Sequence, residues 1–374
     1  MPVFRLGVVD GALPDRRGPR LREFGLRIGG YDPGPADAIT DVPGITVGHV
    51  TVWRDEPDPP AGRGIARTGV TAIVPGDPQS LFGEPVPAGG AVLNGAGEMT
   101  GFLAAAEWGL VETPVYLTST MAVGRIYDGA VAAAVGADPR VGVEDVVIPV
   151  VAECDDSGLS DPRVVQVESS DAGLAVAGAK GGPVPEGAIG AGTGMSAFGW
   201  KAGVGTASRI VPGVNATVGV LALVNLGDRE DLRFDGVPVG RLLRAQEGPR
   251  SRAGSCIVLV TTDARLGADQ LQRVARRAGL GLGRIGSVAH HGSGEIFLAL
   301  STGARRQRDA ARAEPLPDRA LNEVFPAVVD ATEEAVLNAL WAAPDVVGRD
   351  GRLVRGIPHD DVLELLQAHR RLGE

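Results

Sequence analysis

The sequence predicts one α/β domain with layered sheets. Short apolar runs of strand length alternate along the chain with longer amphipathic stretches, which is the pattern of sheets covered by helices. Glycine accounts for 55 of the 374 residues. It is spread through apolar segments, which favours tight turns and close backbone packing over a linker. The length alone would suit two or three domains of ~150 residues, but strands and helices are intermixed throughout. We therefore expect a single unit, residues 1–374.

The first half of the chain contains strands and helices in alternation. Residues 1–36 are polar and are expected to form an arm that packs on a neighbour. A turn of Asp-Val-Pro-Gly leads into a strand at 45–50, and a loop rich in Pro, Arg and Asp follows at 54–68. Residues 94–101 are expected to open a helix that continues through Trp108. The other expected elements are strands at 69–75, 113–118 and 146–152 and helices at 121–135 and 162–177.

The second half repeats this alternation around a polar connection. The densest glycine run, 186–195, precedes a strong strand at 217–225 that ends on the amide side chain of Asn225. Residues 227–254 are polar and are the best candidate for a boundary. The elements expected after it are strands at 255–262 and 293–301, helices at 266–278 and 321–340, a charged loop at 304–316 and a final helix from residue 358.

Composition and charge exclude several classes of protein. The formal net charge is −10 and no basic stripe is present, so nucleic acid is not an expected partner. No apolar run reaches the ~18 residues of a membrane span, and the N-terminus lacks the apolar segment of a signal peptide. Two distant cysteines, Cys154 and Cys256, form neither a disulfide framework nor a metal site. These features predict a cytoplasmic protein.

The most informative position is the border at Gly254-Ser255, where a polar run (248–252) meets an apolar β-branched run. The simplest interpretation is a loop entering a buried strand. The alternative is a peptide bond that cleaves itself, with the Ser255 hydroxyl attacking the carbonyl of Gly254. Ser255 would become an N-terminus whose α-amine, with a pKa of ~7.7–8.0, serves as general base. Glycine suits the preceding position because it has no Cβ to block attack and can hold unusual φ and ψ angles.

Other positions carry groups that such a nucleophile needs. Ser293 and Glu295 project from one face of a predicted strand, where a hydroxyl beside a carboxylate can orient the serine or its amine. An exposed strand end is the alternative. Asn225 can donate its amide N–H to an oxyanion, or it can be a turn residue. Glu153, placed directly after a buried strand, can pair with a substrate amine, or it can be a solvated acid.

Further motifs are weaker. Residues 281–286 match a dinucleotide fingerprint but follow a helix instead of a strand, and residues 190–194 lack the Lys-Ser/Thr ending of a phosphate loop. The histidine pair at 290–291 lacks zinc-site spacing, and no G-x-S-x-G elbow is present. Cys256 faces away from its serine neighbour on a strand and is predicted to be a small buried hydrophobe. No metal and no cofactor are expected.

A series of short segments, in a fixed order, forms the most specific pattern. The segments are 40–44 (Thr-Asp-Val-Pro-Gly), 47–50, 93–95, 97–101, 190–195, 203–209, 218–221 leading to Asn225, 254–255, 293–295 (Ser-Gly-Glu) and 331–340. In this order they cover nearly the whole chain from about residue 21. The chain thereby resembles the self-processing serine aminopeptidases that include the DmpA-like L-aminopeptidase/D-Ala esterase-amidases and the β-peptidyl aminopeptidases.

The resemblance implies an αββα sandwich, layered like the N-terminal nucleophile hydrolases but differently connected. It implies cleavage between Gly254 and Ser255, which gives an α chain of residues 1–254 and a β chain of residues 255–374. It also implies a homo-oligomer of αβ units, with four favoured. The implied reaction is the release of N-terminal amino acids from short peptides, amides or esters through an acyl-enzyme.

The resemblance also implies a role for each site residue. Ser255 is the nucleophile for both self-cleavage and substrate, and Ser293 and Glu295 support it and its amine. Asn225 contributes to the oxyanion site. Glu153 receives the N-terminal ammonium of the substrate.

Three features keep other interpretations open. Some members carry an aromatic residue directly after the acid, whereas this chain has Cys154, Asp155 and Asp156 there, which changes the pocket. Ornithine acetyltransferases resemble the same fold and also self-cleave, but they use threonine in an Ala-Thr-Met-Leu context, and this chain has Gly-Ser-Cys-Ile. A non-catalytic relative could keep the fold for binding. The retention of Ser255 and of the Ser-Gly-Glu segment argues against that last interpretation.

Overall fold

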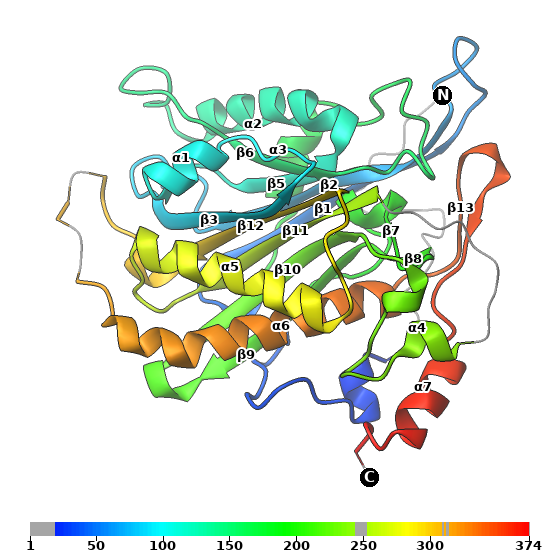
Figure 1. The fold of residues 1–374 in the computed structure, drawn as a ribbon. Helices are drawn as coiled ribbons and strands as arrows, with labels where there is room; N and C mark the ends of the chain where they lie inside the picture. Colours follow the sequence, from blue (N-terminus) through cyan, green and yellow to red (C-terminus); the bar gives the residue numbers. More distant parts are fainter. Residues whose placement is uncertain (1–18, 244–252, 309, 312–313, 374) are drawn as a thin grey trace.

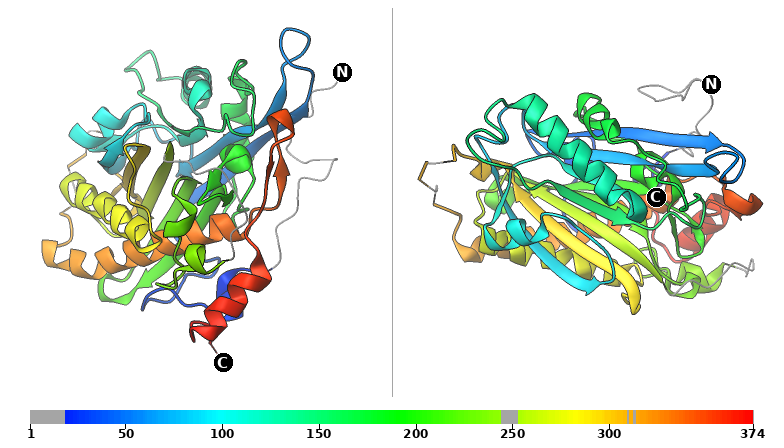
Figure 2. Two further views of the ribbon diagram at one scale, coloured as in Figure 1. Left: turned by 45° about the vertical axis from the view of Figure 1, so that its right-hand side comes forward. Right: turned by 90° about the horizontal axis from the view of Figure 1, so that it is seen from above.

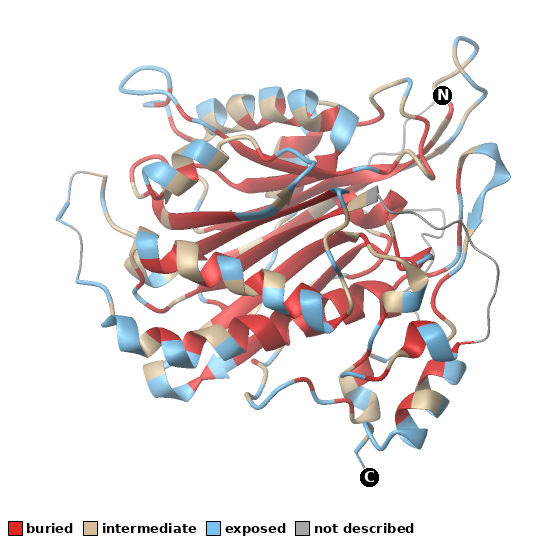
Figure 3. Ribbon diagram, in the orientation of Figure 1, coloured by how far each residue is buried: buried red, intermediate tan, exposed pale blue. Residues whose placement is uncertain are grey.

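The computed structural model describes residues 19–243, 253–308, 310–311 and 314–373. Two β-sheets lie face to face, and helices cover the outer face of each, so the layers run helix, sheet, sheet, helix (Figures 1 and 2). This is the αββα order that the sequence resemblance implied. Strands are buried along most of their length, whereas most of the helices are buried on one side and exposed on the other (Figure 3).

The first sheet has four strands. In pairing order they are β1 (Ile45–Asp55), β2 (Ile65–Pro75), β5 (Val115–Ser119) and β6 (Val150–Cys154). The first two pairings are antiparallel and the pairing of β5 with β6 is parallel. Parallel neighbours need a crossover, and α2 (Val123–Ala137) provides it.

The second sheet has six strands and carries the Gly-Ser border. In pairing order they are β4 (Leu110–Val111), β3 (Val86–Gly95), β12 (Gly292–Ser301), β11 (Ala253–Thr262), β10 (Ala216–Asn225) and β9 (Val204–Val211). Only β11 and β12 run parallel, and α5 (Ala268–Arg284) connects them. Two short hairpins lie outside the sheets, β7 (Ser196–Ala197) with β8 (Trp200–Lys201) and β13 (Val346–Val347) with β14 (Leu353–Val354).

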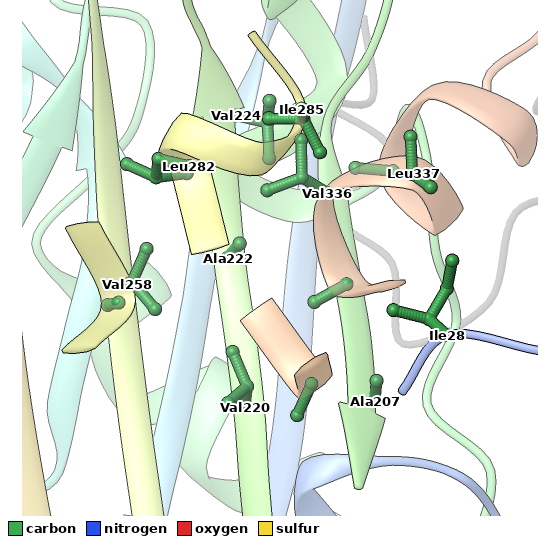
Figure 4. Packing of buried hydrophobic residues seen from close by; sticks show 14 of the residues in the cluster. Ile28, Ala207, Val220, Ala222, Val224, Val258, Leu282, Ile285, Val336 and Leu337 are labelled. Atoms are coloured by element: carbon green, nitrogen blue, oxygen red, sulfur yellow. The ribbon is translucent and has the colours of Figure 1, made fainter. Parts of the chain in front are cut away.

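Three apolar layers hold these elements together. Side chains such as Leu117, Leu221 and Leu259 fill the space between the sheets. Under α2 and α3 (Ser170–Ala177) lies a smaller cluster. The largest cluster joins the second sheet to α5 and α6 (Leu321–Trp341), with Val258 and Val336 among its members (Figure 4). Each fully buried Val, Leu or Ile side chain stabilises the fold by about 1.5–3 kcal/mol.

Helix α6 is enclosed on nearly all sides, and a buried ionic network explains how. Arg209 is fully buried and pairs with Glu334, which also accepts hydrogen bonds from Arg22. Trp341 donates its indole N–H to the carbonyl of Pro19. The segment from residue 19 onward therefore packs on this chain's own α6, which corrects the expectation of an arm on a neighbour for residues 19–36; residues 1–18 lie outside the described part.

Other expectations need smaller corrections. The predicted helix opening at 94–101 is wrong, because residues up to Gly95 belong to β3 and α1 spans only Phe102–Glu107. The loop predicted at 54–68 is shorter, since β1 ends at Asp55 and β2 begins at Ile65. The helix predicted from residue 162 begins only at Ser170. The remaining short helices are α4 (Val239–Leu242) and α7 (His359–Ala368).

None of the described helices is long and apolar enough to cross a membrane.

Candidate active site

The neighbouring ends of β6, β10 and β11 open onto one cleft of about 1670 Å³. Its lining includes Glu153, Asn225 and Ser255. The first and the last of these are 102 positions apart in the chain. Ser255 pairs with Asn225 in the antiparallel ladder of β10 and β11. Directly paired residues share a face of a sheet, so the serine and the amide lie on the same face.

Gly254 and Ser255 lie inside β11, which begins at Ala253, and Ser255 is 4% exposed. The φ angle of Gly254 lies outside the left-handed region, so the expected unusual backbone is absent at this residue. Glycine is needed for a different reason: a Cβ here would lie 2.4 Å from the carbonyl oxygen of Asn225. The tight approach of β10 thus leaves no room for a side chain before the serine.

Asn225 is held from both ends of its amide. Its Oδ1 accepts a hydrogen bond from the backbone N–H of Ser196 at 3.1 Å, and its Nδ2 donates to the carbonyl of Asp155 at 2.9 Å. The Ser196 contact fixes which end of the amide is oxygen. Since Nδ2 carries two hydrogens, one donor remains for another acceptor.

Glu153 lies within β6, not after it as expected, because the strand begins one residue past Pro149 and continues to Cys154. Its Oε1 accepts the backbone N–H of Glu98 at 2.9 Å, and its Oε2 accepts the hydroxyl of Thr120. Burial raises the pKa of its carboxyl, and these two hydrogen bonds offset part of the rise. A carboxylate has about four acceptor positions, so two remain for a cationic group.

Ser293 and Glu295 form a pair, as the two-residue spacing predicted. The Ser293 hydroxyl donates to Glu295 Oε1, and both residues are buried, Glu295 completely. Glu295 Oε2 has no hydrogen-bond partner among the residues that the structure describes. Burial raises the pKa of Glu295, and the Ser293 hydrogen bond offsets part of this.

The pair lies on the other face of the sheet from the Ser255 hydroxyl. Ser255 pairs with Gly294, whose added Cβ would meet Ala96 on the cleft side. Because side chains alternate along a strand, Ser293 and Glu295 point toward the helix-covered face. They can approach the main-chain nitrogen of Ser255, which lies in the plane of the sheet, but the hydroxyl lies on the opposite side.

The turn before β12 is fastened by one asparagine. Asn94 Nδ2 donates to the carbonyl of His290 at 2.9 Å and to that of Ser293, and the Ser293 N–H returns to the His290 carbonyl at 2.8 Å. This explains the asparagine of segment 93–95, to which the sequence alone assigned no contact.

Two residues at the site were missed by sequence reasoning. Cys154 is completely buried and its thiol donates to the carbonyl of Leu223 at 3.7 Å; burial raises the pKa of the thiol, and the neighbouring Ser255 side chain offsets only part of the rise. Cys256 is buried on the opposite face, as predicted.

Lys201 is the second missed residue. It is completely buried, and its ammonium donates to the carbonyls of Gly192, Met195 and Ala202 at 3.1, 2.7 and 2.6 Å. It pairs with Ser196 in the β7–β8 hairpin, so it holds the hairpin whose N–H orients Asn225. Burial lowers the pKa of Lys201 to about 7, whereas three carbonyl acceptors favour the charged form.

The weaker motifs have structural explanations. Residues 281–286 lie at the C-terminal end of α5, which is no place for a dinucleotide. Within the described ranges, the donor atoms of Asp228, Asp231 and His290 lie within 4.8 Å of one another at the cleft. All three are partly solvated and His290 lies 3.6 Å from Asp228, so this grouping alone assigns no metal.

Known proteins match this chain over most of its length. The family described as peptidase family S58 matches residues 37–354. The β-peptidyl aminopeptidase BapA of Sphingosinicella xenopeptidilytica is 40% identical over 371 residues, which cover 94% of this chain and 92% of that protein.

Solved structures match as well. The L-aminopeptidase D-Ala-esterase/amidase of Ochrobactrum anthropi, described as a prototype of the serine aminopeptidases and a new variant of the Ntn hydrolase fold, superposes with a TM-score of 0.88. It is 39% identical, and the match covers 95% of this chain and all of that one. The PH0078 protein of Pyrococcus horikoshii OT3 gives a TM-score of 0.89 at 40% identity, over 94% of this chain and all of that one.

Proposed function

The chain belongs to peptidase family S58 and is a serine aminopeptidase with the Ntn hydrolase fold, and from this premise we propose how its residues divide the work. Ser255 first cleaves the bond to Gly254 and then releases N-terminal amino acids from short peptides, amides or esters. The observation that carries the proposal is the pairing of Ser255 with Asn225 at a cleft that also holds Glu153.

Self-cleavage needs only groups of the chain itself and water. The Ser255 Oγ attacks the carbonyl carbon of Gly254, the C–N bond breaks, and the acyl group moves to oxygen as an ester while the nitrogen takes up a proton. Water then hydrolyses the ester. The products are residues 1–254, ending in a carboxylate, and residues 255–374, beginning with a free amine.

The new amine can donate to the unpaired carboxylate oxygen of Glu295. In the uncleaved strand the Ser255 nitrogen is an amide, and Glu295 Oε2 lacks a partner in the described structure. A buried carboxylate with an unsatisfied oxygen is costly. The free amine of Ser255 donates an N–H to this oxygen and carries a positive charge only while it holds the hydroxyl proton, and the Ser293 hydroxyl keeps the other oxygen in place. The pair therefore serves the amine, not the hydroxyl.

Substrate turnover uses the cleft face. The ammonium of the substrate binds the two open acceptor positions of Glu153, and Asn225 Nδ2 donates to the oxyanion formed when Ser255 Oγ attacks the substrate carbonyl. The Ser255 amine takes the hydroxyl proton and passes it to the leaving group. Water then releases the amino acid from the acyl-enzyme.

We infer the substrate preference from the relatives and from the acidic residue beside Glu153. The relatives are named for β-peptidyl substrates and for L-aminoacyl and D-Ala substrates. Asp155 lines the cleft of this chain beside Glu153 and its carboxylate accepts from Ser157. We infer that a second acid favours substrates with an uncharged or basic first side chain.

We also propose assembly and compartment. Exposed apolar side chains on and beside α1, among them Leu103 and Trp108, support a homo-oligomer of αβ units, with four favoured. Unpaired Cys154 and Cys256 support a reducing, cytoplasmic location. Light scattering of the purified protein measures the assembly directly.

The test of the function compares the natural chain with Ser255→Ala. On a denaturing gel the natural protein runs as two pieces and the variant as one, and only the natural protein hydrolyses a panel of L-, D- and β-aminoacyl amides. An intact single chain with full activity contradicts the proposal.

A further inference from the structure

A second cavity lies far from the cleft, on the outer side of the first sheet. It has a volume of about 290 Å³ and is bounded by β5, the C-terminal half of α2 and α3. None of its lining residues lines the active-site cleft. In Figure 1 these helices form the top layer of the molecule.

The cavity exists because small residues face it from both helices. Gly173 of α3 and Gly136 of α2 line it, and a Cβ added to either would meet no heavy atom within 4 Å. Ala133 and Ala137 of α2 and Ala177 of α3 also line it. Gly136 and Ala177 are exposed, so this space is a hollow that opens to solvent between the two helices, and the small residues leave room in it for a ligand.

One polar group at the cavity has no partner. Tyr116 of β5 is completely buried, lines the cavity, and its hydroxyl has no hydrogen-bond partner in the part of the chain that the structure describes. Buried tyrosine hydroxyls normally find a partner, and an unsatisfied one costs about 1–3 kcal/mol. Burial also raises the pKa of Tyr116, so the hydroxyl keeps its proton and can donate it.

The other polar side chains of the wall are already satisfied within the protein. Glu112 pairs with Arg308 at 2.7 Å, and Asp138 accepts hydrogen bonds from Arg140. Thr113 donates to the carbonyl of Pro114. The two acids also make the wall unfavourable for an anion. Among the described side chains of the wall, the Tyr116 hydroxyl is then the one donor without a partner, on a mainly apolar surface.

We propose that this cavity binds a small, uncharged molecule with an apolar body and one hydrogen-bond acceptor, which accepts from the Tyr116 hydroxyl. The volume lies at the lower end of small-ligand sites, ~300–1,000 Å³, so the ligand has the size of a single ring with a short substituent. Charge is excluded because an apolar wall does not replace the hydration of an ion. The site does not depend on the proposed function of the cleft.

The experiment uses two nearly isosteric probes, acetophenone and ethylbenzene, which differ in a carbonyl. Isothermal titration calorimetry measures their binding to the natural protein, to Tyr116→Phe and to Gly173→Leu. The phenylalanine variant removes only the hydroxyl. The leucine variant fills the cavity, and leucine is a better helix former than glycine. Hydrolysis of an aminoacyl amide without probe should stay at the natural level in both variants, which verifies their folding.

The expected result is specific. The natural protein binds acetophenone at one saturable site, about 2- to 10-fold more tightly than ethylbenzene, as one hydrogen bond predicts. Tyr116→Phe removes this preference, and Gly173→Leu weakens both probes by about 10-fold or more. Crystals soaked with acetophenone show it against Tyr116.

Other outcomes overturn the proposal. These are no saturable binding to the folded natural protein, an unchanged preference in Tyr116→Phe, or unchanged binding in Gly173→Leu. A soaked crystal in which only water, or a side chain of a neighbouring subunit, contacts the Tyr116 hydroxyl also overturns it.

Discussion

The two faces of the six-stranded sheet at Ser255 carry different kinds of polar group. On the cleft face, Asn225 has partners at both ends of its amide and keeps one N–H for a ligand. Glu153, which reaches the same cleft from β6 of the four-stranded sheet, keeps free acceptor positions. On the helix-covered face, Ser293 and Glu295 are buried, and one carboxylate oxygen lacks a partner among the described residues. The first face is prepared for a molecule that arrives from solvent, the second for a group that the chain itself produces.

In the proposed mechanism, this difference separates two tasks of Ser255. Substrate reaches the hydroxyl through the cleft, whereas the proposed amine that activates the hydroxyl is shielded within the sheet. A low dielectric strengthens the contact between the amine and Glu295. The following predictions change one face at a time.

The largest effect on the cleft face is expected at Asn225. Asn225→Ala removes the oxyanion donor and should lower kcat about 10²- to 10³-fold with a small change in KM. Asn225→Asp keeps the acceptor for the Ser196 N–H but loses the donor, so it should lose as much. Steady-state kinetics on an aminoacyl amide measure both. A kcat near the natural value in Asn225→Asp would show that the amide only supports the loop.

A smaller loss is expected at Glu153. Glu153→Gln removes the charge that binds the substrate ammonium and should lower kcat/KM about 10- to 100-fold, because a hydrogen bond to a charged group contributes ~1.5–3 kcal/mol. Hydrolysis of esters of amine-blocked amino acids should be unchanged in Glu153→Gln, because these substrates carry no ammonium. Glu98→Gln, which neutralises an exposed acid of the same cleft, serves as control and should stay within about 2-fold. Equal loss with blocked and free substrates would contradict the role.

A positioning effect is expected at Lys201. Lys201→Met releases three carbonyls that frame the β7–β8 hairpin, so the Ser196 contact to Asn225 loosens and kcat falls about 10-fold. KM should hardly change. Lys180→Met, at the other lysine of the chain and exposed, is the matched control. Combining Lys201→Met with Asn225→Ala should add little further loss, and full additivity would contradict the coupling.

The smallest effect on activity is expected at Asp156. This residue is another buried acid with an unpaired oxygen, so its substitution tests whether such an acid affects activity wherever it lies. Its Oδ2 also lacks a partner in the described part of the chain, and burial raises its pKa to about 7. Between the unfolded pKa of ~3.9 and that value, the folded state holds a proton that the unfolded state releases. The free energy of unfolding therefore falls as the pH rises through this window.

Asp156→Asn has no such proton. In the uncleaved Ser255→Ala background, urea unfolding should show it to be more stable than its parent by about 1–3 kcal/mol at pH 8, with the gap closing at pH 4. Activity in the natural background should remain close to normal. A gap that is the same at both pH values would contradict the buried acid.

Much of this arrangement could be predicted from the sequence, and the rest depends on contacts between distant segments. The period of two placed Ser293 and Glu295 together, and the apolar run after Ser255 predicted its strand. Strand β3 was missed because Pro87, Gly89 and Gly90 weaken its pattern.

The face that each residue occupies needs the pairing register, which no single segment contains. That Glu295 and the Ser255 hydroxyl lie on opposite faces of the sheet follows only from the alignment of Ser255 with Gly294. Lys201 could not be predicted either, since lysine is almost never fully buried. Its acceptors are backbone carbonyls, which leave no sequence signal.

The most direct test of the division between faces is the rate of self-cleavage and turnover in Glu295→Gln beside Glu153→Gln. Intact-mass spectrometry follows the appearance of residues 255–374, and hydrolysis of an amine-blocked ester is measured on the cleaved protein. We predict that Glu295→Gln lowers turnover of this ester about 10²-fold or more and that Glu153→Gln leaves both self-cleavage and ester turnover near normal. Natural turnover in cleaved Glu295→Gln, or a comparable loss in Glu153→Gln, would contradict the account.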